Sequence, residues 1–311
     1  MTDLTDLYPA DRIVLREVGL RDGLQMVRQF PSTHQKQRWI ELARDAGVRN
    51  FEVGSYLPAQ RYPQFADIED IVSAGMDKPG IRLSTLVLNK RGAMRALEGG
   101  AHEIMFVVSA SEAHNLANAN RSRSDTLREI EEAIALRKDM VDAPVAAVAI
   151  AMSFGCSIAG KSAVEPKDVL DIAGRALEAG AQVINIADTV GYGGPTEVRT
   201  IVRQFRSAFR DVPLAFHFHD TRGVGLANAA AALEEGVTIL DASIGGLGGC
   251  PFAPGATGNI VFEDLVFLAH TMGLDTGIDP TRLMDVRQLI DVAMPNEQTY
   301  GQFRRAGLPK A

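Results

Sequence analysis

Cysteine, positive net charge and long apolar runs are all scarce in this chain. Its 311 residues include two cysteines, Cys156 and Cys250, so no disulfide framework is expected and a reducing compartment suits the count. A net charge of -7 and a pI near 5.5 argue against non-specific binding to nucleic acid or an anionic membrane, which depends on Lys and Arg. The longest apolar stretch, near Ala143 to Met152, is too short to span a bilayer. The acidic start resembles neither a signal peptide nor a transit peptide, and these absences together predict a soluble cytoplasmic protein.

The composition is that of a folded protein with a large core. Hydrophobic residues make up 46% of the chain and charged residues 23%, which argues against disorder. A chain of 311 residues fits one barrel-sized domain or two smaller ones.

Apolar, β-rich runs alternate with amphipathic helical patterns along the whole chain. Eight runs read as strands: Ile13 to Val18, Asn50 to Gly54, Arg82 to Val87, Glu103 to Val108, Val145 to Met152, Val183 to Ala187, Leu214 to His219 and Ile239 to Ser243. Helical patterns between and after them include His34 to Ala46, Ser124 to Lys138, Pro166 to Ala179, Pro195 to Phe209, Val224 to Glu235, Gly258 to Thr271 and Pro280 to Ala293. Those between strands are long enough to be the crossover helices of a parallel sheet.

A short glycine-containing sequence recurs between the end of a predicted helix and the start of the next strand. It places Gly47, Gly100, Gly180 and Gly236 before the second, fourth, sixth and eighth strands, where glycine would close the helix in a left-handed conformation. Eight serial βα units predict an α/β fold of the TIM-barrel type, a (β/α)8 barrel with an extra C-terminal helix, and a doubly wound open sheet is the alternative. We predict one domain over residues 1–311, with the barrel at about 11–275 and a helical extension at about 276–311.

The seventh predicted strand carries two histidines, His217 and His219. Because side chains alternate along a strand, both imidazoles must point the same way, as two ligands of one divalent metal would. Two histidines held by ordinary hydrogen bonds at a strand end are the competing interpretation.

In a barrel the chemistry lies at the carboxyl ends of the strands, so residues there should meet the two histidines. Arg21, Asp22 and Gln25 follow the first strand on a glycine-bearing turn, although a solvated ion pair there is also common. Glu52 lies inside the second strand, where a buried carboxylate needs a partner such as Arg21. Asp188 ends the sixth strand and would otherwise be a turn cap.

The segment after the eighth strand is rich in glycine and contains Cys250. Such a loop lets the backbone approach a ligand closely, and a thiol near a cation can act as general acid or base. Asn259 follows as a plausible amide-oxygen ligand of the metal, and Glu263 as its hydrogen-bonding support or an ordinary first-turn acid.

These segments together resemble a known family. The stretches Glu17 to Gln25, His217 to Thr221 and Gly248 to Asn259 are similar to those of the 3-hydroxy-3-methylglutaryl-CoA lyases, within a larger group of metal-dependent barrel enzymes that includes the isopropylmalate synthases. The histidine pair and the first turn mark the larger group, and the cysteine-bearing loop marks the lyases. The resemblance spans most of the chain.

The resemblance implies a role for each matching residue. Metal ligands would be Asp22, His217, His219 and Asn259; catalytic residues Arg21, Cys250, Asp188 and Glu52; and substrate-binding residues Gln25, Ser55 and Thr189. The implied cofactor is a divalent metal, Mg2+ or Mn2+, and the implied partners are an acyl-CoA substrate and a second copy of the chain.

The implied reaction is a retro-Claisen cleavage of 3-hydroxy-3-methylglutaryl-CoA to acetyl-CoA and acetoacetate, a step of leucine degradation. Arg21 would stabilise the enolate oxygen and Cys250 would protonate the enolate carbon, while His217 or Asp188 could take the hydroxyl proton. Met26 stands where the family carries asparagine, and the loop after the fifth strand lacks the usual proline, tyrosine and glutamate. Citramalyl-CoA or a longer 3-hydroxy-3-alkylglutaryl-CoA is therefore an alternative substrate, and a condensing synthase or a non-catalytic binding protein is an alternative function.

Overall fold

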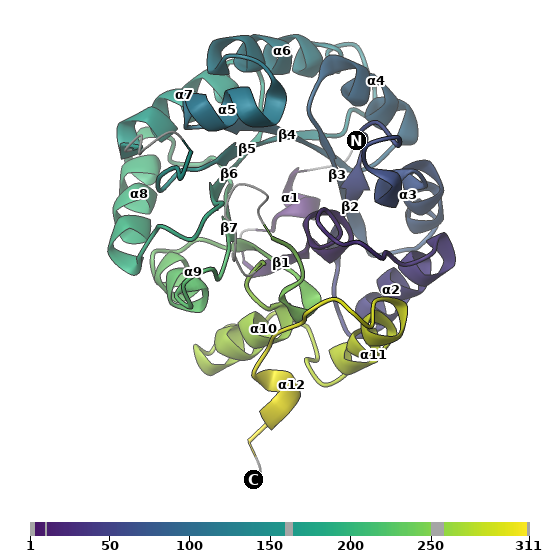
Figure 1. The fold of residues 1–311 in the computed structure, drawn as a ribbon. Coiled ribbons are helices and arrows are strands. Elements are labelled where there is room, and N and C mark those ends of the chain that lie inside the picture. The colour runs from purple at the N-terminus through teal and green to yellow at the C-terminus, as the bar shows by residue number, and fades with distance from the viewer. Residues whose placement is uncertain (1–3, 10, 159–163, 250–257, 310–311) are drawn as a thin grey trace.

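Eight parallel strands close into a barrel in the computed structural model, which describes residues 4–9, 11–158, 164–249 and 258–309 (Figure 1). The strands are β1 (Val14–Glu17), β2 (Asn50–Ser55), β3 (Arg82–Val87), β4 (Glu103–Ser109), β5 (Val145–Ala151), β6 (Val183–Asp188), β7 (Leu214–Phe218) and β8 (Ile239–Ala242). Each pairs in parallel with its neighbour in sequence, and β1 also pairs with β8. The predicted barrel is therefore confirmed, and closure through β1 and β8 excludes the open sheet.

Helices surround the barrel and connect its strands (Figure 1). They are α1 (Leu4–Leu7), α2 (Thr33–Asp45), α3 (Ile68–Met76), α4 (Lys90–Gly99), α5 (Glu112–Ala119), α6 (Arg123–Ala135), α7 (Pro166–Glu178), α8 (Pro195–Ala208), α9 (Gly225–Glu234), α10 (Phe262–Thr271), α11 (Leu283–Ala293) and α12 (Phe303–Ala306). Short turns are η1 (Gly19–Gly23, a π-helical turn), η2 (Pro63–Phe65) and η3 (Ile244–Gly246). Ser32 begins α2 with a capping box to Gln35, which fixes where that helix starts.

The four glycines at the helix-to-strand junctions have the conformation expected of them. The φ angles of Gly47, Gly100, Gly180 and Gly236 are 107°, 75°, 101° and 79°, in the region that other residues adopt with strain. Each of these repeated glycines thus ends a helix and lets the chain turn back into the next strand of the barrel.

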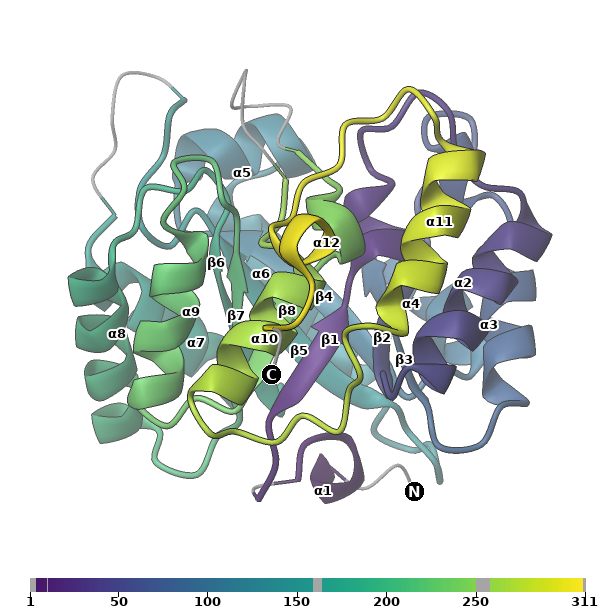
Figure 2. The ribbon, with the colours of Figure 1, turned by 90° about the horizontal axis from the view of Figure 1, so that it is seen from below.

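The core has two parts. The larger lies between the barrel and its helices and contains buried aromatic residues such as Trp39, Phe51 and Phe205. The smaller fills the lower interior of the barrel with Val14, Met105, Val145 and other strand residues, together with Leu7 and Tyr8. Figure 2 shows α1, which ends at Leu7, below the barrel, so the N-terminal segment closes that end.

The helix predicted after the barrel, Pro280 to Ala293, is present as α11, which packs against α2. The short helix α12, which was not predicted, lies beside α10. The carboxylate of Asp264 on α10 accepts hydrogen bonds from the N–H groups of Gln302 and Phe303, and the Phe303 side chain is buried. The assignment of residues 1–311 to one domain stays a prediction. No helix within the described part of the chain has the length and apolar character needed to cross a membrane.

Candidate metal centre and active site

The two histidines of β7 converge on one point at the upper end of the barrel. His217 lies on the strand and His219 directly after it, and their side chains share a face because they are two residues apart. The Nε2 atoms lie 3.1 Å apart, and both side chains are buried. Two ligands about 2.1 Å from one ion and at right angles to each other would be about 3.0 Å apart.

The carboxylate of Asp22, which follows β1, lies beside the two imidazoles. Asp22 Oδ2 lies 3.4 Å from His219 Nε2 and 3.9 Å from His217 Nε2. Within the described residues, these three side chains form the only group of at least three His, Cys, Asp or Glu residues close enough to hold a metal ion. The arrangement is compatible with a divalent-metal site.

Asp22 reaches this point because η1 turns the chain sharply after β1. The carbonyl of Val18 accepts hydrogen bonds from the N–H groups of Arg21, Asp22 and Gly23. The turn packs so closely that a Cβ at Gly19 would lie 2.4 Å from Glu17 Oε1 and 2.7 Å from the Trp39 ring. Glycine at position 19 is therefore required by the space available.

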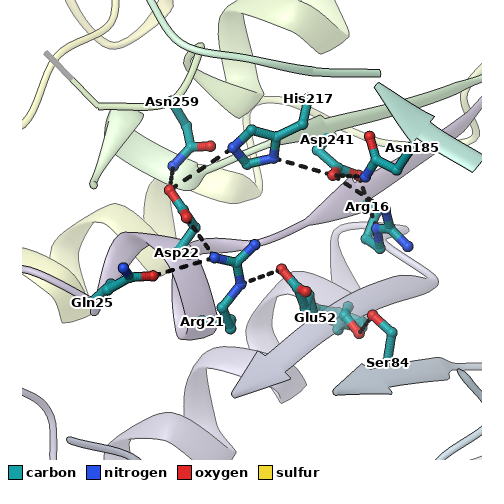
Figure 3. Close-up of polar contacts among 12 residues, drawn as sticks. Arg16, Arg21, Asp22, Gln25, Glu52, Ser84, Asn185, His217, Asp241 and Asn259 are labelled. Carbon is teal, nitrogen blue, oxygen red and sulfur yellow. Dashed lines mark hydrogen bonds and ion pairs between the residues drawn. The ribbon is translucent and has the colours of Figure 1, made fainter. Parts of the chain in front are cut away.

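Asn259 lies beside the carboxylate of Asp22. Its Nδ2 donates to Asp22 Oδ2 at 2.8 Å and to the carbonyl of Leu247 at 2.9 Å, while its Oδ1 is buried without a hydrogen-bond partner (Figure 3). A buried amide oxygen left without a partner is costly, and coordination to a cation would remove that cost. The donor set of two imidazoles, a carboxylate and an amide oxygen fits a divalent cation.

Gly248 makes room for this amide. A Cβ at Gly248 would lie 2.6 Å from Asn259 Nδ2 and 3.2 Å from Asp22 Oδ2, and the residue has a φ of 125°. At the neighbouring Gly249 the nearest atom to such a Cβ is Met26 Cγ at 3.9 Å. The position of the Asn259 amide therefore requires glycine at residue 248, whereas it places no such requirement on residue 249.

Arg21 is held beside the metal centre by three acceptors. Its Nε donates to Glu52 Oε2 at 2.6 Å, and its Nη1 donates to Asp22 Oδ1 at 2.6 Å and Gln25 Oε1 at 3.4 Å (Figure 3). The predicted partnership of Glu52 with Arg21 is confirmed. Because its side chain is fixed from several directions, the guanidinium is pre-organised next to the cluster.

Ion pairing outweighs burial in setting the charge of Asp22. Burial alone would raise the pKa of this carboxyl, but the Arg21 guanidinium and the two histidines hold it below its usual range. Asp22 is therefore ionised, as a metal ligand must be. Glu17, under the same turn, differs: burial raises its pKa to about 8, and its Oε2 is buried without a partner.

A cavity above the cluster brings several predicted site residues together. It encloses about 890 Å³, its open mouth included, and its polar lining contains Arg21, Asp22, Gln25, Glu52, Asn185, Thr189, His217 and His219. The rest of its wall is mainly apolar, with Leu57, Leu86, Leu88, Met105, Val107, Ala149, Ala151 and Ala187. His114 and Asn118 of α5 also line it, and the sequence analysis did not identify them.

Two predicted site residues, Asp188 and Ser55, do not face the cavity as expected, and a third lies outside the described part of the chain. Asp188 uses both carboxylate oxygens to accept the N–H groups of Tyr192 and Gly193, at 2.8 and 3.0 Å, as a turn cap does. Ser55 is fully buried and is not among the residues that line the cavity. Cys250 lies outside the described residues. The catalytic roles of Asp188 and Cys250 and the substrate-binding role of Ser55 therefore stay predictions.

A layer of buried polar residues beneath the histidines was missed by the sequence analysis. Asp241 of β8 contacts His217, Asn185 and Arg16, and all of these side chains are buried. The clue in the sequence was a charged residue inside each of two short apolar strands, Arg16 in β1 and Asp241 in β8. A charge buried within a strand needs an oppositely charged partner, because burial of an unpaired charge costs too much free energy.

Sequence and structure comparisons give one consistent family. The model of the HMGL-like family matches residues 12–290. A hydroxymethylglutaryl-CoA lyase of Bacillus subtilis is 35% identical over 92% of this chain and 94% of its own length. An (R)-citramalyl-CoA lyase of Chloroflexus aurantiacus is 36% identical over 88% of each chain.

The solved structures agree with this assignment. The structure of an HMG-CoA lyase from Acinetobacter baumannii in complex with coenzyme A and 3-methylmalate has a TM-score of 0.89 and 34% identity, and covers 97% of this chain and 99% of that one. With the closed barrel, the metal-ligand geometry and the full-length similarity pointing the same way, this chain belongs to the HMGL-like family of lyases.

Proposed function

We propose that this protein is a divalent-metal-dependent lyase that cleaves 3-hydroxy-3-methylglutaryl-CoA to acetyl-CoA and acetoacetate. The observation that carries the proposal is the convergence of Asp22, His217 and His219 beside Asn259, whose Oδ1 is buried without a partner, with Arg21 at the edge of the same cavity. The similarity to hydroxymethylglutaryl-CoA lyases over most of the chain supports it.

The ligands proposed for Mg2+ or Mn2+ are Asp22 Oδ2, the Nε2 atoms of His217 and His219, and Asn259 Oδ1. A cation bound there would act as a Lewis acid and lower the pKa of the substrate's tertiary hydroxyl. Transfer of the hydroxyl proton to a base, for which Asp188 is the remaining candidate, would let the carbon–carbon bond break, so that the hydroxyl carbon becomes the ketone and the electron pair passes to the thioester enolate.

Arg21 is the residue proposed to stabilise that enolate. Its guanidinium lines the cavity and is fixed by Glu52, Asp22 and Gln25, so it would donate hydrogen bonds to the enolate oxygen as negative charge develops there. A proton delivered to the enolate carbon completes acetyl-CoA, and Cys250 is the proposed donor. His217 is proposed as a ligand first, because coordination through Nε2 would engage the lone pair that a base needs.

The cavity wall favours a second candidate substrate. Strands β5 and β6 line the cavity with small apolar side chains, namely Ala149 and Ala151 of β5 and Ala187 of β6. An alkyl group longer than methyl on the hydroxyl carbon would contact this surface without burying a polar group. A Pseudomonas aeruginosa relative, 34% identical over 96% of this chain, is named as a lyase for both isohexenyl and methyl compounds.

The test is a comparison of substrates with purified protein and Mg2+ or Mn2+. The measurement is kcat/KM for 3-hydroxy-3-methylglutaryl-CoA, citramalyl-CoA and 3-hydroxy-3-isohexenylglutaryl-CoA, with release of the keto acid as the readout. A preference for the methyl compound supports the first candidate. Preference for the isohexenyl compound, reduced selectively in Ala149→Leu, supports the second.

Failure of the lyase proposal would also be visible in this assay. No cleavage of any thioester, with incorporation of acetyl-CoA into 2-oxo acids instead, would identify a condensing enzyme. Binding of Mn2+ with neither activity would identify a non-catalytic binding protein. The proposed homodimer is tested separately by light scattering on the purified protein.

A further inference from the structure

Beneath the proposed metal site lies a layer of polar side chains that three adjacent strands place side by side. His217 of β7 is the register partner of Asp241 of β8, and Asp241 is the register partner of Arg16 of β1. The register brings the three side chains into contact inside the barrel, where each is at most 6% exposed (Figure 3). Water is therefore a poor competitor for their hydrogen bonds.

Asp241 occupies the centre of this layer. Its Oδ2 lies 3.1 Å from His217 Nδ1 and accepts from Asn185 Nδ2 at 2.8 Å and Arg16 Nη2 at 3.1 Å, while its Oδ1 accepts from Arg16 Nε at 2.8 Å. An ionised carboxylate can only accept hydrogen bonds, so His217 Nδ1 must carry the proton. In the neutral ring the lone pair is then on Nε2, the atom that faces His219 and Asp22.

Arg16 is in turn held from below. Its Nη1 donates to Glu103 Oε1 at 2.6 Å and to the Tyr8 hydroxyl at 3.1 Å, and that hydroxyl donates to Glu103 Oε2 at 2.6 Å. Tyr8 directly follows α1, in the N-terminal segment that closes the lower end of the barrel. A continuous set of hydrogen bonds thus joins this segment to His217.

We propose that Asp241 is a positioning residue that fixes the tautomer and ring orientation of His217, and that Arg16 and Tyr8 extend this support to the N-terminal segment. The inference rests on the proposed metal site. It assigns the lower end of the barrel a part in metal affinity, through the orientation of one ligand.

Asp241→Asn is the sharpest test because it keeps the shape of the side chain. Oδ2 receives the Asn185, His217 and Arg16 Nη2 donors and Oδ1 only Arg16 Nε, so the amide oxygen would take the place of Oδ2 and the new NH2 group would lie against Arg16 Nε. His217 Nδ1 would then donate to a neutral amide oxygen in place of a carboxylate, which weakens the support of the ring and lowers the basicity of Nε2. We expect the Kd for Mn2+ to rise about 10- to 100-fold.

The tautomer itself is a second readout that a merely structural role would not move. Nitrogen-15 NMR of histidine side chains in the metal-free protein should show a proton fixed on Nδ1 of His217 in the wild type and a mixture of the two tautomers in Asp241→Leu, which offers Nδ1 no acceptor. The His217 signals are assigned by their absence in His217→Gln. An unchanged tautomer together with unchanged Mn2+ affinity overturns the proposal.

Tyr8→Phe tests the lower half of the chain of contacts and also decides the matter if Asp241→Asn does not fold. It removes the one hydroxyl between Arg16 and Glu103, and we expect the Kd for Mn2+ to rise about two- to fivefold. Val14→Ala is the matched control, because it loosens the same lower layer without touching a polar contact. Equal Mn2+ affinity in Tyr8→Phe and Val14→Ala contradicts the role of Tyr8.

The outcomes separate this inference from the proposed function. Wild-type protein that binds no Mn2+ removes the metal site and the lyase proposal with it. Wild-type protein that binds Mn2+ and cleaves the thioester, with Asp241→Asn and Tyr8→Phe unchanged, removes only the positioning role.

Discussion

The upper and lower halves of the barrel interior both contain buried charges, but they use them differently. In the lower layer Arg16 pairs with Asp241 and Glu103, and Tyr8 closes the set. In the upper layer Asp22 and Arg21 are paired, yet Asn259 Oδ1, His219 Nδ1 and Glu52 Oε1 are buried without partners. Together with Asn185 Oδ1, which is also buried without a partner and belongs to a residue of the cavity lining, these atoms mark where the fold leaves polar groups available for a ligand, because unused hydrogen-bonding capacity inside a protein is costly.

Replacing the Asp22 carboxylate of the upper layer should have the largest effect of the variants considered. That effect should be on turnover. We expect Asp22→Asn to lower kcat/KM for the thioester by about 10³-fold, since a Lewis-acid contribution is typically several kcal/mol. Thermal stability should change little, because Arg21 keeps its contact with Glu52. Steady-state kinetics beside a melting curve measures both. A large loss of stability with preserved kcat/KM would place Asp22 with the structural charges.

Removing the central charge of the lower layer should act first on stability. Arg16→Met leaves Asp241 and Glu103 buried without their shared cation, which we expect to lower the free energy of unfolding by about 3–5 kcal/mol. Urea unfolding is the measurement. Arg203→Met, which breaks the exposed pair of α8 with Glu235, is the control and should leave the free energy of unfolding nearly unchanged. Similar losses in both variants would contradict the distinction.

Adjacent glycines at the upper layer allow a matched test of the Asn259 position. A methyl group at residue 248 would displace the Asn259 amide, whereas one at residue 249 meets only the Met26 side chain at contact distance. We therefore expect Gly248→Ala to raise the Kd for Mn2+ at least about tenfold and Gly249→Ala to leave it unchanged. Isothermal titration of both variants decides it, and equal affinities would argue against Asn259 as a ligand.

The smallest effect should be a pH dependence of stability that originates at Glu17. Burial raises the pKa of this carboxyl from 4.5 to about 8, so the folded protein keeps a proton that the unfolded chain releases. Its contribution to stability is fully present below pH 4.5 and is lost as the pH rises to about 8. Glu17→Gln should therefore lose less stability than the wild type between pH 5 and pH 8 in urea unfolding. An unchanged slope would mean that Glu17 is ionised in the folded state.

Much of the fold could be predicted from the sequence because its determinants are local. Apolar runs bounded by turns located all eight strands to within about two residues, and the glycines at positions 47, 100, 180 and 236 identified helix ends. The π-helical turn η1 was not foreseen, since it depends on three N–H groups sharing the Val18 carbonyl and on the contact of Gly19 with Trp39. Such contacts between distant residues leave no local pattern.

In the candidate site, too, some residues could be identified from the local sequence and others could not. The histidine pair was evident because strand alternation fixes where both rings point, and Glu52 was identified by the need of a buried carboxylate for a cation. Asp241 and Arg16 were missed because strands of a closed barrel are buried on both faces, so the pattern does not tell which side chains point inward. Only the register of β7, β8 and β1 brings them together.

Among the residues that the structure describes, the segment that ends in Tyr8 covers the lower end of the barrel, whereas the cavity lies at the upper end. A thioester whose carbon–carbon bond is cleaved in this cavity would enter at the upper end, and both fragments would leave there. The product bound deeper in the cavity can leave only after the product above it has left. The shape of the cavity would therefore set the order of product release. The product released last should compete with incoming substrate.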